Sequence, residues 1–234
     1  MENINQIRLI SVWVFIITFT SLNLCLFISV NYHLLEGTIF TVDPIGRSGF
    51  TIPYIDGSVS ISRTARTFPA YIVFKSGMLI TAILLIQYWR ANNKLIQTIN
   101  NDFNKNKYFL FFGVGSAVCL VIHSLLLGIQ FEVDLYKFFR RFVLLTFIIF
   151  ELMAQAMLIN SIIKIKNKIA ETINRKILIV KIFVVSVLII IVILSLPILA
   201  SSGHVHFKHA LEWNYFLGVI IFYLFTFLFW RKQP

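Results

Sequence analysis

The stretch from Ile177 to Ser201 reads ILIVKIFVVSVLIIIVILSLPILAS, and it decides the fold class of this protein. A helix needs about 20 mostly apolar residues to cross the hydrocarbon core of a bilayer. The stretch exceeds this length, and Lys181 is its only charged residue. It therefore predicts a transmembrane helix.

Five more stretches have the same character. The six predicted spans are residues 9–30, 69–89, 108–129, 139–162, 177–201 and 210–230. The chain of 234 residues is 58% hydrophobic and 13% charged, with a mean hydropathy of +0.84, whereas soluble domains carry about 25% charged residues. The sequence thus predicts an all-α membrane protein, a six-transmembrane-helix bundle that forms a single integral membrane domain over residues 1–234.

The formal net charge of +11 comes mostly from the segments between the predicted spans. This distribution argues against nucleic acid as a partner and indicates basic loops that face membrane lipids. Most Lys and Arg residues lie near the chain termini and in the segments 90–107 and 164–181. The positive-inside rule therefore predicts that both termini are cytosolic. In a bacterium this membrane would be the inner membrane.

The segment between the first two spans, residues 31–68, is the long connection on the outer side of the predicted topology. It is rich in the turn formers Gly, Pro and Asp. Two runs within it, Thr38–Val42 and Gly57–Ile61, have the composition of strands. We predict a partly ordered loop with a small β-hairpin over the outer ends of the helices. The alternative is a passive lid.

Ionisable side chains in hydrocarbon are costly, so each one is a candidate for function. The candidates are Lys75, His123, Glu151 and Glu212 within the spans, with Arg140 and Arg141 where the fourth span opens. The predicted topology places all of them near the outer surface except Glu151, which lies near the midplane. Glu151 must be neutral or paired, and its expected partners are Lys75, His123 or an arginine.

Each candidate also has a purely structural interpretation. Lys75 can extend its amine to the interface, as Lys181 can at the cytosolic end of its own span. Glu212 can cap its own helix, where the dipole favours an acid. His123 can form an interhelical hydrogen bond.

A metal site is a further candidate in the connection between the last two spans. It would use His204, His206 and His209, with Glu212 and His123 nearby. The spacing fits no specific zinc motif. We therefore expect no metal and no other cofactor.

Two segments carry a resemblance to a known family. Residues 53–63 read PYIDGSVSISR, and the sixth span opens with Glu212-Trp213. Together with six spans, a long first outer loop and His123 in the third span, they resemble the Frag/DRAM/Sfk group. This group includes GPI-anchor remodelling factors, the N-terminal part of the Cwh family and autophagy modulators. In a eukaryote the resemblance implies a lipid-linked role in the Golgi or ER, the lysosome or the plasma membrane. It carries over to Ser58, Ser60, His123 and Glu212.

We therefore predict a protein that binds or remodels a lipid or glycolipid, such as a GPI anchor, at the outer or luminal leaflet. For chemistry, acyl transfer or lipid hydrolysis is the expected class, with His123 as the base and Glu212 or Glu151 as its orienting partner. The predicted lipid-binding residues are Lys75, Arg140, Arg141, Ser58 and Ser60, of which the cations would hold a lipid phosphate.

Two alternatives to a lipid enzyme or lipid binder stay open. One is a non-catalytic membrane organiser that resembles the autophagy modulators. The other is a small transporter in which Glu151 carries a proton or an ion. Against transport, the sequence shows no inverted repeat and no pair of Gly/Pro-broken helices.

Overall fold

The computed structural model describes residues 2–35, 38, 51–66, 68–99, 108–129, 134–201 and 203–232. Six long helices dominate it. They are α1 (Glu2–Val30), α4 (Ala70–Ile99), α5 (Tyr108–Leu126), α6 (Asp134–Ile165), α7 (Arg175–Ala200) and α8 (Val205–Phe229). Each is long and apolar enough to cross a membrane. The residues described contain no strand, so the predicted all-α six-span bundle is confirmed.

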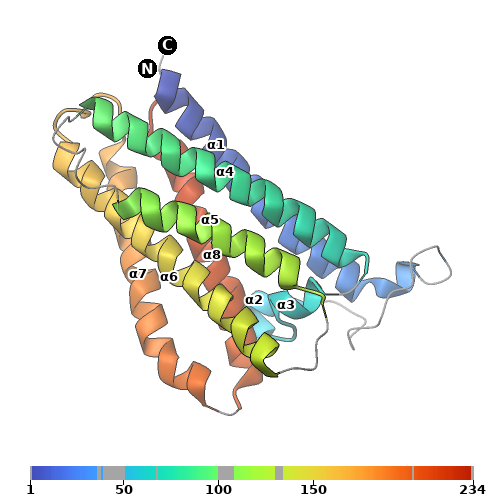
Figure 1. Cartoon of the computed structure of the whole chain (residues 1–234). Coiled ribbons are helices and arrows are strands. Elements are labelled where there is room, and N and C mark those ends of the chain that lie inside the picture. Colours follow the sequence, from blue (N-terminus) through green and yellow to red (C-terminus); the bar gives the residue numbers. More distant parts are fainter. Residues whose placement is uncertain are drawn as a thin grey trace.

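The long helices pack in a ring that follows their order in the sequence. α1 packs on α4, α4 on α5, α5 on α6, α6 on α7 and α7 on α8, and α8 closes the ring against α1. Figure 1 shows both chain termini at the same end of the bundle. We call the opposite end the outer end, after the predicted topology.

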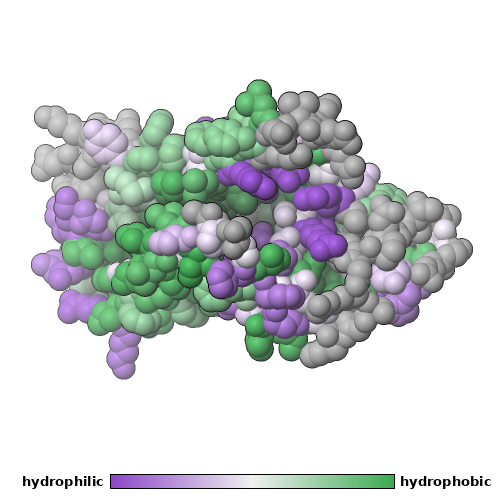
Figure 2. Space-filling view, turned by 90° about the horizontal axis from the view of Figure 1, so that it is seen from below, coloured by the Kyte–Doolittle hydropathy of each residue, from purple (hydrophilic) through white to green (hydrophobic). Residues whose placement is uncertain are grey.

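The outward faces of the helices are apolar. On α7 the side chains of Ile179, Phe183, Ile190 and Leu194 are each more than half exposed. Figure 2 shows a hydrophobic band between two regions where hydrophilic residues gather. An apolar surface of this kind is stable when lipid tails cover it, since they demand no hydrogen bonds.

Small residues let the helices approach closely inside the bundle. Gly113 of α5 lies against Trp89 of α4, and a Cβ atom at Gly113 would come within 2.3 Å of the indole. Ala117, one turn later, is fully buried. Small residues at such positions allow close helix packing.

The predicted β-hairpin is wrong in its second half. Pro53 opens the short helix α2 (Pro53–Asp56), and Gly57 ends it with a φ of 57°. Ser60 then caps the next short helix, α3 (Ile61–Thr64), by accepting a hydrogen bond from the Arg63 N–H. Helix starts and stops of this kind override the β propensity of residues 57–61. The first predicted run, residues 38–42, lies outside the described residues apart from Thr38.

Candidate functional site

Residues 51–66, which we call the outer cap, are fastened to the start of α8. Three side chains of α8 bond to main-chain carbonyls of the cap: Trp213 Nε1 to Val59 (2.9 Å), Asn214 Nδ2 to Tyr54 (2.6 Å) and His209 Nδ1 to Gly57 (3.0 Å). The ring of Tyr54 also packs against that of Trp213, with 5.1 Å between the ring centres. The opening of the sixth span, which carried the family resemblance, therefore serves to hold the cap in place.

Glu212 belongs to the same attachment. Its carboxylate hydrogen-bonds the backbone N–H groups of Ile61 and Ser62 at the start of α3. It thus caps a helix of the cap and not its own helix, because its side chain extends away from α8 toward α3. On the α1 side, Ser29 Oγ donates to the Thr64 carbonyl over 2.8 Å. The cap is therefore wedged between α1 and α8.

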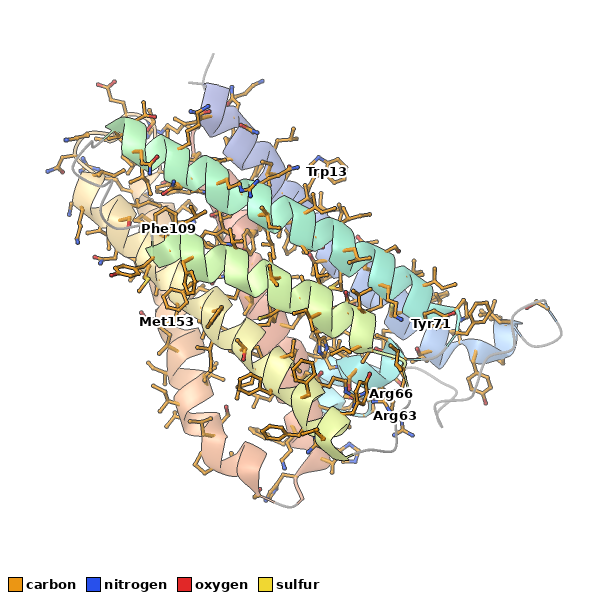
Figure 3. All side chains as sticks on the ribbon, in the orientation of Figure 1. Trp13, Arg63, Arg66, Tyr71, Phe109 and Met153 are labelled. Atoms are coloured by element: carbon orange, nitrogen blue, oxygen red, sulfur yellow. The ribbon has the colours of Figure 1, made fainter. Side chains whose placement is uncertain are left out.

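Arginines gather where the cap meets α6. Arg63 and Arg66 lie three positions apart at the end of the cap, and Figure 3 shows both beside the first turns of α6. Burial, and then the positive charges of Arg140 and Arg63, lower the pKa of the Arg66 guanidinium. We call Arg63, Arg66, Arg140 and the neighbouring His123 the arginine cluster.

Two buried nitrogen atoms of the arginine cluster lack partners. His123 is 7% exposed and lies beside Arg140. Its imidazole interacts with the guanidinium charge of Arg140 and hydrogen-bonds the Arg140 main chain. Its Nδ1 has no hydrogen-bond partner among the described residues, and neither does Nε of Arg66. Buried polar atoms are almost always satisfied, so these two nitrogens indicate a place for a further group. The guanidinium Nε of Arg66 can only donate, so the group that would satisfy it is an acceptor, and the two neighbouring arginines favour an anion.

The other predicted lipid-binding residues are placed differently. Lys75 is half-buried, with Nζ 5.3 Å from the ring centre of Tyr71. Arg141 is exposed next to Arg140. Ser60 Oγ lies 3.3 Å from Ser62 Oγ within the cap, and the buried Ser58 Oγ has no partner in the part of the chain that is described.

The three histidines considered as candidate metal ligands do not converge. His204 and His206 are exposed, while His209 is bonded to the cap. Among the described residues, no three His, Cys, Asp or Glu side chains lie close enough to hold a metal ion.

Glu151 lies deep in the bundle and is 1% exposed. Ser116 Oγ donates to its Oε2 over 2.7 Å, Gln155 Nε2 donates to its Oε1 over 3.0 Å, and the hydroxyl of Tyr223 also donates to Oε1. The expected charged partner is thus wrong, because these three donors are a serine, an amide and a phenol. They come from α5, α6 and α8, so this group, the Glu151 cluster, joins three helices.

The structure does not bring the predicted catalytic residues together. His123 is seven residues after Ser116 on α5, which is about 10 Å along the helix axis. On the facing helix, Arg140 precedes Glu151 by eleven residues, or about 16 Å. His123 therefore lies in the arginine cluster, Glu151 lies two to three turns deeper, and Glu212 is bonded to the cap.

Lys181 is a buried residue whose position the sequence does not reveal. The sequence predicts that its amine extends to the surface, but the side chain is 1% exposed. Its Nζ donates to Thr226 Oγ1 over 2.6 Å and lies 3.9 Å from the ring centre of Phe222. The hydroxyl of Tyr88 bonds the same Thr226 oxygen at 3.2 Å. The side chain turns inward because α7 presents this position to α8, and the only sequence signal was a lone lysine in the most apolar span.

Comparison of the chain with protein-family models, with curated proteins and with solved structures finds no match. The arginine cluster, the Glu151 cluster and the buried Lys181 are therefore the features of the chain that bear on its function.

Proposed function

We propose that this multi-pass membrane protein binds the anionic head group of a lipid or glycolipid at its outer end. The observation that carries the proposal is the unpartnered buried Nε of Arg66 beside the like charges of Arg63 and Arg140, with the unpartnered Nδ1 of His123 next to them. Like charges repel, and an anion between them relieves this cost. A phosphate suits the cluster because the guanidinium fork of arginine matches its geometry.

The surroundings of the cluster favour a lipid over a free anion. Arg140 lies in a segment of α6 whose aromatic side chains Phe138, Phe139 and Phe142 are 65%, 47% and 55% exposed. In a membrane these rings would contact acyl chains, while the guanidinium groups lie at the level of the head groups. A molecule with a phosphate and two apolar chains fits both features. A phosphatidylinositol-based glycolipid such as a GPI anchor has this composition, in keeping with the proposed relationship to the Frag/DRAM/Sfk group.

Binding is better supported than remodelling. A lipid hydrolase or acyltransferase needs a base, its orienting partner and the scissile bond within hydrogen-bond reach of one another. The separation of His123 from Glu151 by two to three helical turns does not favour that arrangement. We therefore propose a lipid-binding role, with cytosolic termini and the arginine cluster on the outer or luminal side.

The test measures binding of short-chain phosphatidylinositol to the purified protein in detergent by native mass spectrometry. Phosphatidylcholine provides the zwitterionic reference. Arg66→Gln should weaken phosphatidylinositol binding by about 10-fold, because a charge-assisted hydrogen bond is lost. Arg90→Gln removes the same charge from an exposed position in the second half of α4, away from the cap, and should have no effect.

Two results would contradict the proposal. One is equal affinity of the wild-type protein for the two lipids. The other is an equal loss of affinity in Arg66→Gln and Arg90→Gln, which would mean that net charge, and not the cluster, attracts the lipid.

A further inference from the structure

The hydrogen bonds of Ser116 permit two arrangements of one proton. Ser116 Oγ lies 2.7 Å from Glu151 Oε2 and 2.8 Å from the main-chain carbonyl oxygen of Gly113. A hydroxyl has a single hydrogen to donate but can also accept. Ser116 can therefore donate to Glu151 or to Gly113, but not fully to both at once.

Each arrangement matches one charge state of Glu151. When the carboxyl is ionised, it accepts hydrogen bonds from Ser116, Gln155 and Tyr223. When it is protonated at Oε2, its new O–H can donate to Ser116 Oγ, and Ser116 then donates to the Gly113 carbonyl. In both states Glu151 Oε2 and Ser116 Oγ keep a hydrogen-bond partner at the distances found in the structure.

We propose that Glu151 is a reversible proton-binding site inside the membrane bundle, with Ser116 as the hydroxyl that accommodates both charge states. Uptake transfers one proton from bulk water to Oε2, forms one O–H bond and neutralises the carboxylate, and release reverses each change. This activity does not depend on lipid binding, since it uses different residues at a different depth.

The groups around Glu151 support exchange and not a fixed ion pair. The ionisable side chains that act on it are the phenols of Tyr223 and Tyr215 on α8 and of Tyr88 on α4. α5 and α6 contribute the hydroxyl and the amide already named, and α7 carries Lys181, which is bonded to Thr226. A carboxylate bonded to neutral donors can gain a proton without leaving a buried cation unpaired.

Thr226 and Lys181 repeat the arrangement of Ser116 and Glu151, with a cationic group in place of the acidic one. Thr226 Oγ1 lies 2.6 Å from Lys181 Nζ and 3.0 Å from the Phe222 carbonyl. An ammonium group can donate to Thr226 while the threonine donates to Phe222, and a neutral amine can instead accept from the threonine. Thr226 follows Tyr223 by three residues, so one face of α8 carries both buried sites.

The experiment records infrared spectra of the purified wild-type protein in detergent as the pH is changed. The C=O stretching band of protonated carboxylic acids should appear reversibly, and Glu151→Gln, which keeps the shape of the side chain, should remove the component due to Glu151 from among the ten Asp and Glu residues. Tyr223→Phe removes a donor to the carboxylate and should move the pH midpoint of the band by about one unit. Size-exclusion profiles and circular dichroism verify that each variant is folded.

Ser116→Ala is compared with Ser161→Ala, a buried serine of α6 whose hydroxyl bonds the Met157 carbonyl of its own helix. Ser116→Ala should change the frequency of the band, because the alternative donor and acceptor is lost, and Ser161→Ala should leave it unchanged. The proposal is overturned if the wild type shows no pH-dependent band. It is also overturned if the band is unaltered in Glu151→Gln, or, should that variant not fold, if Ser116→Ala and Tyr223→Phe leave the band as in the wild type.

Discussion

The indole of Trp213 donates a hydrogen bond to the main-chain carbonyl of Val59 over 2.9 Å, and it thereby ties the last membrane helix to the outer cap. Trp213 is fully buried and Val59 nearly so. The bond fixes the segment that carries Arg63 and Arg66, so the geometry of the arginine cluster depends on a contact made on the other side of the cap.

Trp213→Phe should loosen the cap without removing the apolar ring. The Val59 carbonyl loses its indole donor, and an unsatisfied buried acceptor costs about 1–3 kcal/mol. We expect a lower Tm in detergent and faster tryptic cleavage after Arg63 and Arg66. Trp13→Phe is the control, because Trp13 is 47% exposed on α1 and points away from the bundle (Figure 3). Equal effects of the two changes would show that the hydrogen bond does not hold the cap.

The orientation predicted from charge can be tested with single cysteines. A cysteine in place of the exposed His206 should react with an impermeant maleimide added to intact cells, and one in place of the exposed Lys94 should not. Cys25 and Cys119 are first replaced by serine. The opposite labelling pattern would place the arginine cluster on the cytosolic side and overturn the proposed leaflet.

Lys181→Met should leave the protein as stable as the wild type or make it more stable. The amine is bonded to Thr226, a neutral residue, and a methionine of similar length removes the cost of burying a charge. Thermal unfolding in detergent measures the effect. Lys176→Met, at an exposed position at the start of the same helix, should not change Tm. A large loss of stability confined to Lys181→Met would mean that the ammonium group is required by the fold.

The sequence predicted the six helices because apolar stretches of bilayer length have few other uses. The second predicted span ends at Trp89, and α4 continues as a helix to Ile99, since polar residues that favour helix extend it beyond the hydrocarbon. The sequence identified Glu151 as a buried carboxyl but gave it charged partners. Depth along a span can be counted from the sequence, but the face that each helix turns to its neighbours depends on packing. The same reason explains why Lys181 was expected at the surface.

His123 provides the prediction that separates lipid binding from lipid chemistry. Its Nδ1 is available to a bound head group, so His123→Asn should lower the affinity for phosphatidylinositol while the fold is kept. Ser124→Ala is the matched control, because Ser124 is a buried neighbour whose hydroxyl bonds the Val121 carbonyl of its own helix. Mass spectrometry of the lipids after incubation with the wild-type protein should show no conversion, since His123 lies about 10 Å along α5 from the Glu151 cluster. Conversion by the wild type that His123→Asn abolishes and Ser124→Ala preserves would instead establish His123 as a catalytic base and replace the binding role with remodelling.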